Sequence, residues 1–308
     1  MPESALPLGP GLHVFERGWL SSNNILLDDG DGAALVDSGH CVHAAQTVAL
    51  LRQQLGPRPL RRLINTHLHS DHCGGNAALQ REWPLQLQVP SGSWHAVQDW
   101  DTQALSHRPT GQRCERFHAQ GRISAGERLR IGARDWQALG APGHDPLSLM
   151  LFDAEHGVLI SADALWENGF GVVFPELEGE AAFDDVQRVL DLIETLPVRC
   201  VIPGHGAPFT DVGAALQRAR SRLAGFRADP ARHLRHGAKV LLKYHLMEER
   251  QQAMPALRSW MHDTPLLHAI WAELGHPEGS LAAWAERLLQ ELLDSGALQW
   301  RDGTVHDA

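Results

Sequence analysis

Short apolar runs, separated by clusters of Gly, Asp and Asn, recur through the first two hundred residues and predict a β-rich body. The cluster Asp28–Gly32 between two such runs predicts a tight hairpin turn. Amphipathic stretches between the runs predict helices. The predicted elements are strands at residues 12–15, 23–27, 33–36, 60–65, 85–89, 136–139, 147–152 and 158–161, and helices at 42–55, 93–97 and 181–196.

The pattern becomes helical from about residue 208 onward. After the last helical stretch, an Asp-Gly pair at residues 302–303 predicts a small hairpin at 298–305. This change of pattern predicts two domains, at residues 1–210 and 211–308. The helices predicted in the second domain lie at 214–226, 238–250, 254–261, 266–274 and 281–293.

Metal-ligand side chains are concentrated directly after the predicted strand 60–65. His67, His69, Asp71 and His72 lie within six positions of one another, and Gly74-Gly75 follow as a loop. Side chains two apart on an extended backbone point the same way, so His67 and His69 can converge on one ion. Neutral imidazole and carboxylate groups suit zinc, and also iron or manganese.

Three further polar residues lie at strand ends or in the loops that follow them. His144 follows Ala-Pro-Gly, Asp163 follows the apolar run 158–162, and His205 follows Pro-Gly. The ends of strands in open α/β sheets are where functional side chains usually gather. These three residues are therefore candidates for the same site as the first cluster.

This set of residues, in this order, resembles the metallo-β-lactamase-fold hydrolase superfamily over about residues 12–210. The resemblance implies an α+β fold, an αββα sandwich of two mixed β-sheets flanked by helices. It also implies two divalent ions, zinc first and iron or manganese as alternatives. The implied ligands of one ion are His67, His69 and His144; those of the other are Asp71, His72 and His205, with Asp163 bridging the two.

The resemblance further implies hydrolysis by a hydroxide that bridges the two ions. Asp71 and Asp163 are the candidates for orienting this nucleophile and passing on its proton. Asp37, in the segment Val-Asp-Ser-Gly, matches a position that hydrogen-bonds a metal-binding loop.

The sequence indicates the type of reaction more clearly than it indicates the substrate. The segment 163–171 resembles the glyoxalase II thioesterases, but Val172 stands where those enzymes have a cation. The two lysines of the chain lie far downstream, so a glutathione pocket is not expected. Lactonases of the superfamily carry a tyrosine near the position of Trp166. Trp166, Phe170 and Phe174 are instead expected to line an apolar cleft for a thioester, lactone or ester of small size.

Composition limits the partners and the compartment. The net charge of −10 argues against a general polyanion binder, and no apolar run approaches the length of a membrane span. Met1–Gly11 lacks the pattern of a signal peptide. Four scattered cysteines without a CxxC pair predict neither a thiolate zinc site nor a disulfide framework, and favour a cytoplasmic protein.

Helices followed by a hairpin give the second domain a likeness to winged-helix appendages found on some proteins of this fold. Its last helix is acidic, so nucleic acid is not the expected partner, and the domain is interpreted as a lid, a packing platform or a homodimer surface. Two other functions remain open from the sequence. One is a phosphodiesterase or ribonuclease; the other is a non-catalytic, metal-bearing regulatory protein.

Overall fold

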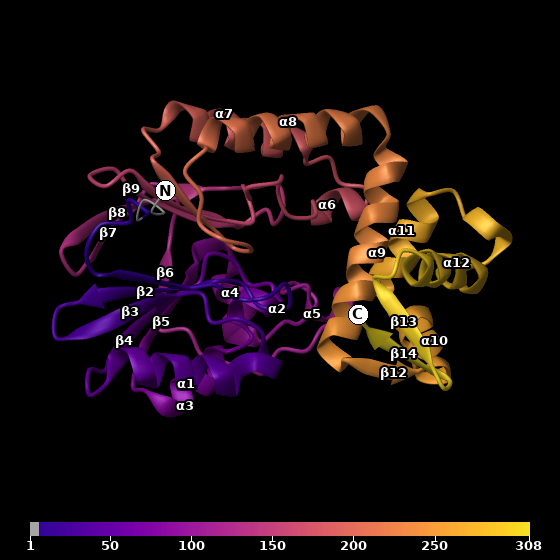
Figure 1. The fold of residues 1–308 in the computed structure, drawn as a ribbon, viewed down its shortest axis with the longest axis horizontal. Coiled ribbons are helices and arrows are strands. Elements are labelled where there is room, and N and C mark those ends of the chain that lie inside the picture. The colour runs from indigo at the N-terminus through magenta and orange to yellow at the C-terminus, as the bar shows by residue number, and fades with distance from the viewer. Residues whose placement is uncertain (1–5) are drawn as a thin grey trace, which may run out of the picture.

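Two β-sheets form the body of the molecule in the computed structural model, which describes residues 6–308 (Figure 1). Residues 1–5, where the segment without a signal-peptide pattern begins, lie outside this range. The first sheet has the order β1-β2-β3-β4-β5-β6 and the second β11-β10-β9-β8-β7. The strands are β1 Leu12–Phe15, β2 Asn24–Asp29, β3 Gly32–Val36, β4 Leu60–Ile64, β5 Gln86–Pro90, β6 Gly121–Ile123, β7 Arg128–Ile131, β8 Arg134–Gly140, β9 Leu149–Asp153, β10 Val158–Ala162 and β11 Cys200–Pro203.

The central strands are buried on both faces because each sheet is covered on both sides. In β2, Ile25 and Leu27 point into the core between the sheets, whereas Leu26 points into the core under the outer helices. In β9, Leu151 and Met150 divide in the same way between the two cores of the second sheet. This period of two is the ordinary alternation of a strand, and it produces the continuous apolar runs in the sequence.

Helices cover the outer face of each sheet, as Figure 1 shows. On the first sheet these are α1 Ala44–Leu55, α3 Asn76–Glu82 and α4 Trp94–Asp99; on the second they are α7 Phe183–Thr195 and α8 Val212–Ala228. Three short helices, α2 Ser70–Cys73, α5 His107–Thr110 and α6 Phe174–Leu177, lie between strands. The predicted αββα sandwich of two mixed sheets is confirmed.

The C-terminal part is a helical unit with a small sheet, and it packs against one end of the body (Figure 1). Its sheet has the order β12-β14-β13, so the predicted hairpin is joined by a third strand. The winged-helix character of this unit stays a prediction. Its elements are α9 Pro230–Glu249, β12 Gln251–Ala253, α10 Met254–Asp263, α11 Pro265–Glu273, α12 Leu281–Asp294, β13 Leu298–Arg301 and β14 Thr304–Asp307. No helix within residues 6–308 is both long enough and apolar enough to cross a bilayer.

The junction between the two parts lies at Asp229-Pro230, between α8 and α9. A residue before proline is disfavoured in helical conformation, which ends α8, and Pro230 then starts α9. The Asp229 side chain accepts a hydrogen bond from Arg232 N at 3.1 Å and caps the new helix. Because α8 packs into the core of the body through Leu216 and Leu223, we propose a domain boundary near Asp229 instead of residue 210.

Candidate metal centre

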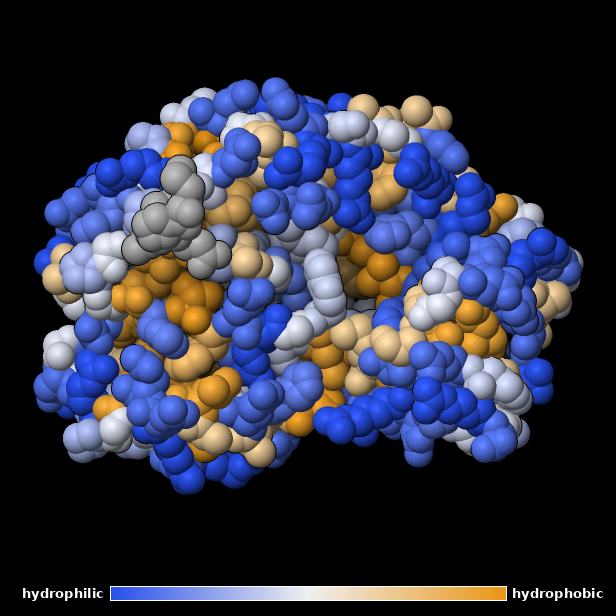
Figure 2. All heavy atoms as spheres, viewed as in Figure 1, coloured by the Kyte–Doolittle hydropathy of each residue, from blue (hydrophilic) through white to orange (hydrophobic). Residues whose placement is uncertain are grey.

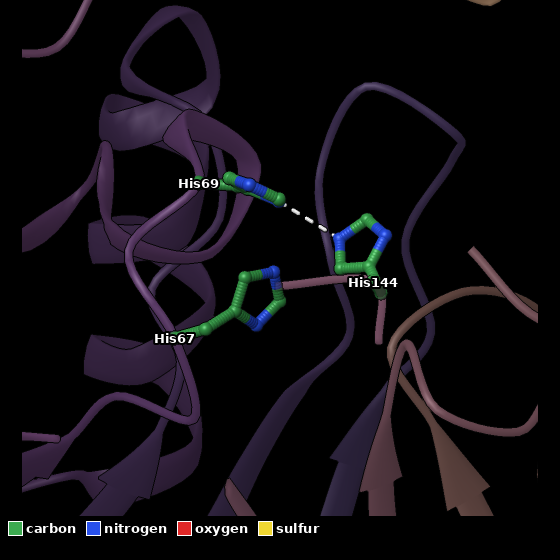
Figure 3. Close-up of side chains that lie close together, drawn as sticks. All are labelled: His67, His69 and His144. Atoms are coloured by element: carbon green, nitrogen blue, oxygen red, sulfur yellow. Dashed lines mark hydrogen bonds between the residues drawn. The ribbon is translucent and has the colours of Figure 1, made fainter. Parts of the chain in front are cut away.

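Two groups of metal-ligand side chains meet at one end of the sandwich. His67, His69 and His144 form the first group, and their rings face one another in Figure 3. Asp71, His72, Asp163 and His205 form the second group. In each group one ligand atom per residue lies within 4.8 Å of all the others. Every metal-ligand residue expected from the sequence is therefore brought into one of the two groups.

Local backbone structure accounts for the convergence of the first cluster. His67 follows β4, and the helix α2 begins directly after His69, so the chain turns between the two halves of the motif. The turn brings His72 to Asp163 and Asp71 to His205, while the His72 ring stays beside that of His67, with the centroids 4.0 Å apart. The sharp bend that precedes Asp163 is marked by a positive φ of 48° at Ala162, a conformation that costs free energy and recurs at functional sites.

Hydrogen bonds fix the ring nitrogens that remain free to bind an ion. Asp37 Oδ2 accepts from His72 Nδ1 at 2.8 Å and from Thr66 Oγ1 at 2.7 Å. Since the Thr66 hydroxyl donates to Asp37, it accepts from His67 Nδ1 at 3.1 Å. In their neutral, metal-binding forms His67 and His72 then carry the proton on Nδ1 and keep a lone pair on Nε2. Among the described residues neither Nε2 has a hydrogen-bond partner, although both are buried, and this fits metal binding.

His144 is oriented in the same way from a different loop. Its Nδ1 donates to Val172 O at 2.6 Å, which leaves the Nε2 lone pair directed at His69 Nδ1, 2.8 Å away (dashed line in Figure 3). Burial lowers the pKa of both His69 and His144 to about 4, so the two rings are neutral near pH 7. Neutral imidazole is the form that binds metal.

Asp163 lies between the two groups. One carboxylate oxygen is 3.3 Å from His144 Nε2, and the other is 3.5 Å from His72 Nε2. Burial alone would raise the pKa of Asp163, but electrostatic interactions with the neighbouring rings of His72, His205 and His144 outweigh burial and lower the pKa well below its usual range. Asp163 is therefore a carboxylate that can face ions on both sides.

The surroundings of His72 are strongly anionic. Burial by itself would lower the pKa of His72, but the carboxylates of Asp163, Asp37 and Asp71 together raise it well above the usual value. Asp71 Oδ2 also lies 3.0 Å from His205 Nε2. Three carboxylates around a few imidazoles are a set of charges that a divalent cation balances.

Gly204, next to His205, leaves room for Asp163. A Cβ atom at this position would lie 2.1 Å from Asp163 Oδ1. We expect Gly204→Ala to displace the carboxylate and to lower the free energy of unfolding by roughly 1–3 kcal/mol, measured by chemical denaturation. Gly213→Ala in α8 is the matched control, because no described atom lies within 4 Å of its added Cβ; its effect should stay within about 1 kcal/mol. Equal losses in the two variants would contradict this role of Gly204.

A cleft of about 560 Å³ opens above the two groups, between the body and α9. Figure 2 shows a hollow with apolar residues where these two parts meet. Trp166 and Phe174 line the cleft, as expected, and Trp166 Nε1 also donates to Asp163 Oδ1 at 3.1 Å. Phe170 does not line it: the side chain is buried in the core of the body, with its ring 6.3 Å from that of Phe226.

Several residues of the cleft were not predicted from the sequence. Trp19, from the loop before β2, stacks on His205 with the ring centroids 5.6 Å apart. The helix α9 contributes Tyr244, whose hydroxyl lies 2.9 Å from Ser70 Oγ in the metal-binding motif. The segment between β5 and β6 contributes Gln112. Other residues of α9 that line the cleft are Lys239, Val240, Leu241, Lys243 and Met247.

Comparison with known proteins agrees with this geometry. The sequence profile of the Metallo-beta-lactamase superfamily matches residues 17–205, the span that holds every residue of the two groups. A hydroxyacylglutathione hydrolase of Xanthomonas euvesicatoria pv. vesicatoria (strain 85-10) is 33% identical over 224 residues, which cover 71% of this chain and 74% of that protein. An acyl-coenzyme A thioesterase of Gallus gallus is 27% identical over 219 residues, covering 65% and 79%.

The fold extends to solved structures of low sequence identity. A metallo-beta-lactamase family protein from Thermus thermophilus has a TM-score of 0.57 and 21% identity, over 98% of this chain and 100% of that one. The likeness therefore includes the C-terminal part. Together with the sequence profile and the relative of 33% identity, it confirms the resemblance inferred from the motif. The chain belongs to the metallo-beta-lactamase superfamily of metal-dependent hydrolases.

Proposed function

We propose that this protein hydrolyses thioesters that carry an apolar acyl group, with two divalent ions bound by the two ligand groups. The observation that carries the proposal is the cleft, whose apolar walls lie directly above the ligands. Its apolar lining comes from both parts of the molecule and consists chiefly of Trp19, Trp166, Val172, Phe174, Val240 and Met247. An acyl chain buried there gains roughly 0.8 kcal/mol per methylene group.

The residues around the ligands suit the cleavage of an acyl bond. The two ligand groups would hold divalent ions, which would lower the pKa of a bound water and polarise the carbonyl group of the substrate. Asp163, which faces both ligand groups, would orient the attacking water, and Asp71 would accept its proton. The Tyr244 hydroxyl lies 2.9 Å from Ser70 Oγ at the wall of the cleft, and it would donate its hydrogen to the acyl oxygen in place of Ser70.

The positions of both lysines of the chain favour a thioester whose thiol carrier is negatively charged. They lie far downstream of the motif in the sequence, but Lys239 and Lys243 both line the cleft from α9. Lys239 pairs with Glu291 at 2.5 Å, and Lys243 pairs with Asp307. Phosphate or carboxylate groups of a coenzyme A or glutathione carrier could exchange with these partners. The two relatives named above are hydrolases of these carriers' thioesters.

The proposal is tested with a panel of acyl-coenzyme A, acylglutathione, lactone, phosphodiester and short RNA substrates, with and without chelator. We expect metal-dependent release of free thiol, fastest for thioesters with apolar acyl groups. Turnover of phosphodiesters or RNA without turnover of thioesters would overturn the proposal. So would two bound ions per chain with no turnover of any substrate.

A lactone is the second candidate, because Tyr244 brings a phenol to the cleft from α9. The sequence suggested that the tyrosine of related lactonases was missing here. In the structure Tyr244 lines the same cleft as Trp166 and Asp163. Preference for lactones over thioesters in the panel would favour this assignment.

We propose zinc as the native metal, with iron and manganese as alternatives that the same ligands accept. We also propose a cytoplasmic location, and a homodimer stays a prediction.

A further inference from the structure

A third group of metal-ligand side chains lies outside the two groups of the hydrolase centre. Cys73 ends α2, His107 begins α5, and Cys114 follows in the loop after α5. One ligand atom from each residue lies within 4.8 Å of the other two. The scattered cysteines of the sequence predicted no thiolate site, but Cys73 and His107 are buried together and Cys114 is half-buried beside them.

The spacing of the two sulfur atoms fits a shared ion. Cys73 Sγ and Cys114 Sγ are 3.8 Å apart. A disulfide requires about 2.05 Å, whereas two thiolates at about 2.3 Å from one tetrahedral zinc ion lie about 3.8 Å from each other. The pair is thus arranged as along one edge of a zinc tetrahedron.

His107 provides a second, independent observation. Its Nε2 is buried and has no hydrogen-bond partner among residues 6–308. A buried nitrogen without a partner costs about 1–3 kcal/mol, a cost that a ligand removes. Imidazole with two thiolates is a ligand set that selects thiophilic divalent ions, zinc first among them.

We propose that Cys73, His107 and Cys114 bind one zinc or similar thiophilic divalent ion, separate from the ions of the hydrolase centre. On binding, the two thiols release their protons to water and the imidazole binds as the neutral ring. His107 and Cys114 also line a surface cavity of about 540 Å³, from which water could reach the fourth coordination position.

An ion at this position would support the wall of the cleft. Gln112 lies between His107 and Cys114 in the chain, lines the cleft, and accepts a hydrogen bond from Ser70 Oγ at 2.7 Å. The next residue, Arg113, pairs with Glu248 of α9. The ion would therefore join α2 to the loop after α5, which contacts α9 through Arg113, and would hold Gln112 at the cleft.

Cobalt substitution tests the proposal, because the hydrolase centre contains no sulfur ligand. Thiolate bound to Co²⁺ gives a charge-transfer absorption band in the near ultraviolet, which histidine and aspartate ligands do not give. We expect this band in the wild-type protein. Cys114→Ser should lose the band and should bind one ion fewer per chain. His107→Ala should show a weaker band. Cys200→Ser, which changes a buried cysteine of β11 outside the group, should keep the band and the ion content.

Two outcomes would overturn the proposal: a cobalt-loaded wild-type protein without the band, and a band that survives Cys114→Ser. Asp163→Asn should keep the band, so a failure of the proposed hydrolase function is recognised separately. If Cys114→Ser does not fold, alkylation of the wild-type protein decides. Bound metal should then protect Cys73 and Cys114, while Cys41, which lines the same cavity, reacts as fast as it does in metal-free protein. Equal protection of all three would contradict the site.

Discussion

Replacement of Asp163 by asparagine should lower kcat/KM for the preferred thioester by roughly a hundredfold to a thousandfold, about 3–4 kcal/mol of transition-state stabilisation. The expected loss follows from both the position and the negative charge of the Asp163 carboxylate. The carboxylate faces His144 at 3.3 Å and His72 at 3.5 Å, so it reaches both ligand groups. Asparagine keeps the size of the side chain but removes its negative charge. The measurement is the steady-state release of thiol, with metal content determined on the same samples.

Asp191→Asn is the matched control for this variant. Asp191 lies on the outside of α7 and pairs with Arg220 at 2.9 Å, outside the cleft. Its removal should leave turnover and metal content at the wild-type level, since exposed ion pairs contribute little. Wild-type turnover by Asp163→Asn would show that this residue is not needed for the reaction, and would remove the basis for its bridging role.

The sequence predicted the body of the fold because strand alternation and strong turns mark most of its elements. In the body, the sequence did not predict β6 and β7, which have three and four residues. Two of the four residues of β7 are Arg128 and Arg130, so no apolar run marks this strand. The predicted domain boundary placed α8 in the second domain, because its apolar face looks the same whichever core it enters. Its packing in one core with α7 is the reason to propose that it belongs to the body.

The metal centre was predictable because its ligands follow recognisable strand ends in a fixed order. The wall of the cleft that α9 forms was not predictable, because α9 lies more than 150 residues after the motif: Tyr244 and Ser70 are separated by 174 positions. Phe170 and Phe174 have the same residue type and lie four positions apart, yet one enters the core and the other the cleft. Sequence spacing alone does not show which side of a loop faces the substrate.

The same distance in sequence hid the third group of ligands. Cys73 and Cys114 are 41 positions apart and have no CxxC spacing, and His107 lies in a weakly patterned excursion. Folding brings them together because the segment between β5 and β6, which carries His107 and Cys114, passes next to α2 before β6 begins. The centre and the third group thus share one short helix, α2, which carries Asp71 and His72 toward the cleft and Cys73 toward the excursion.

Asp37→Asn is expected to weaken metal binding by about tenfold to a hundredfold, although Asp37 belongs to neither ligand group. The carboxylate is buried and accepts from Thr66 N at 2.9 Å, from Thr66 Oγ1 and from His72 Nδ1. An amide has one acceptor oxygen, so its NH₂ group must face one of these donors. If it faces His72, the proton moves to Nε2 and the ring loses the lone pair that binds the ion.

The same substitution should lower the free energy of unfolding by about 1–3 kcal/mol, for one buried donor without a partner. Backbone strain does not add to this loss, because asparagine tolerates the left-handed φ of 57° at this position. Asp153→Asn separates the two effects: Asp153 is equally buried and accepts from Arg134 and His156, outside the ligand groups. Both variants should lose stability, but only Asp37→Asn should lose affinity in a competition assay with a chelator. If the two variants bind metal equally well, Asp37 stabilises the fold without setting the proton position of His72, and the orientation of the ring must come from the surrounding packing alone.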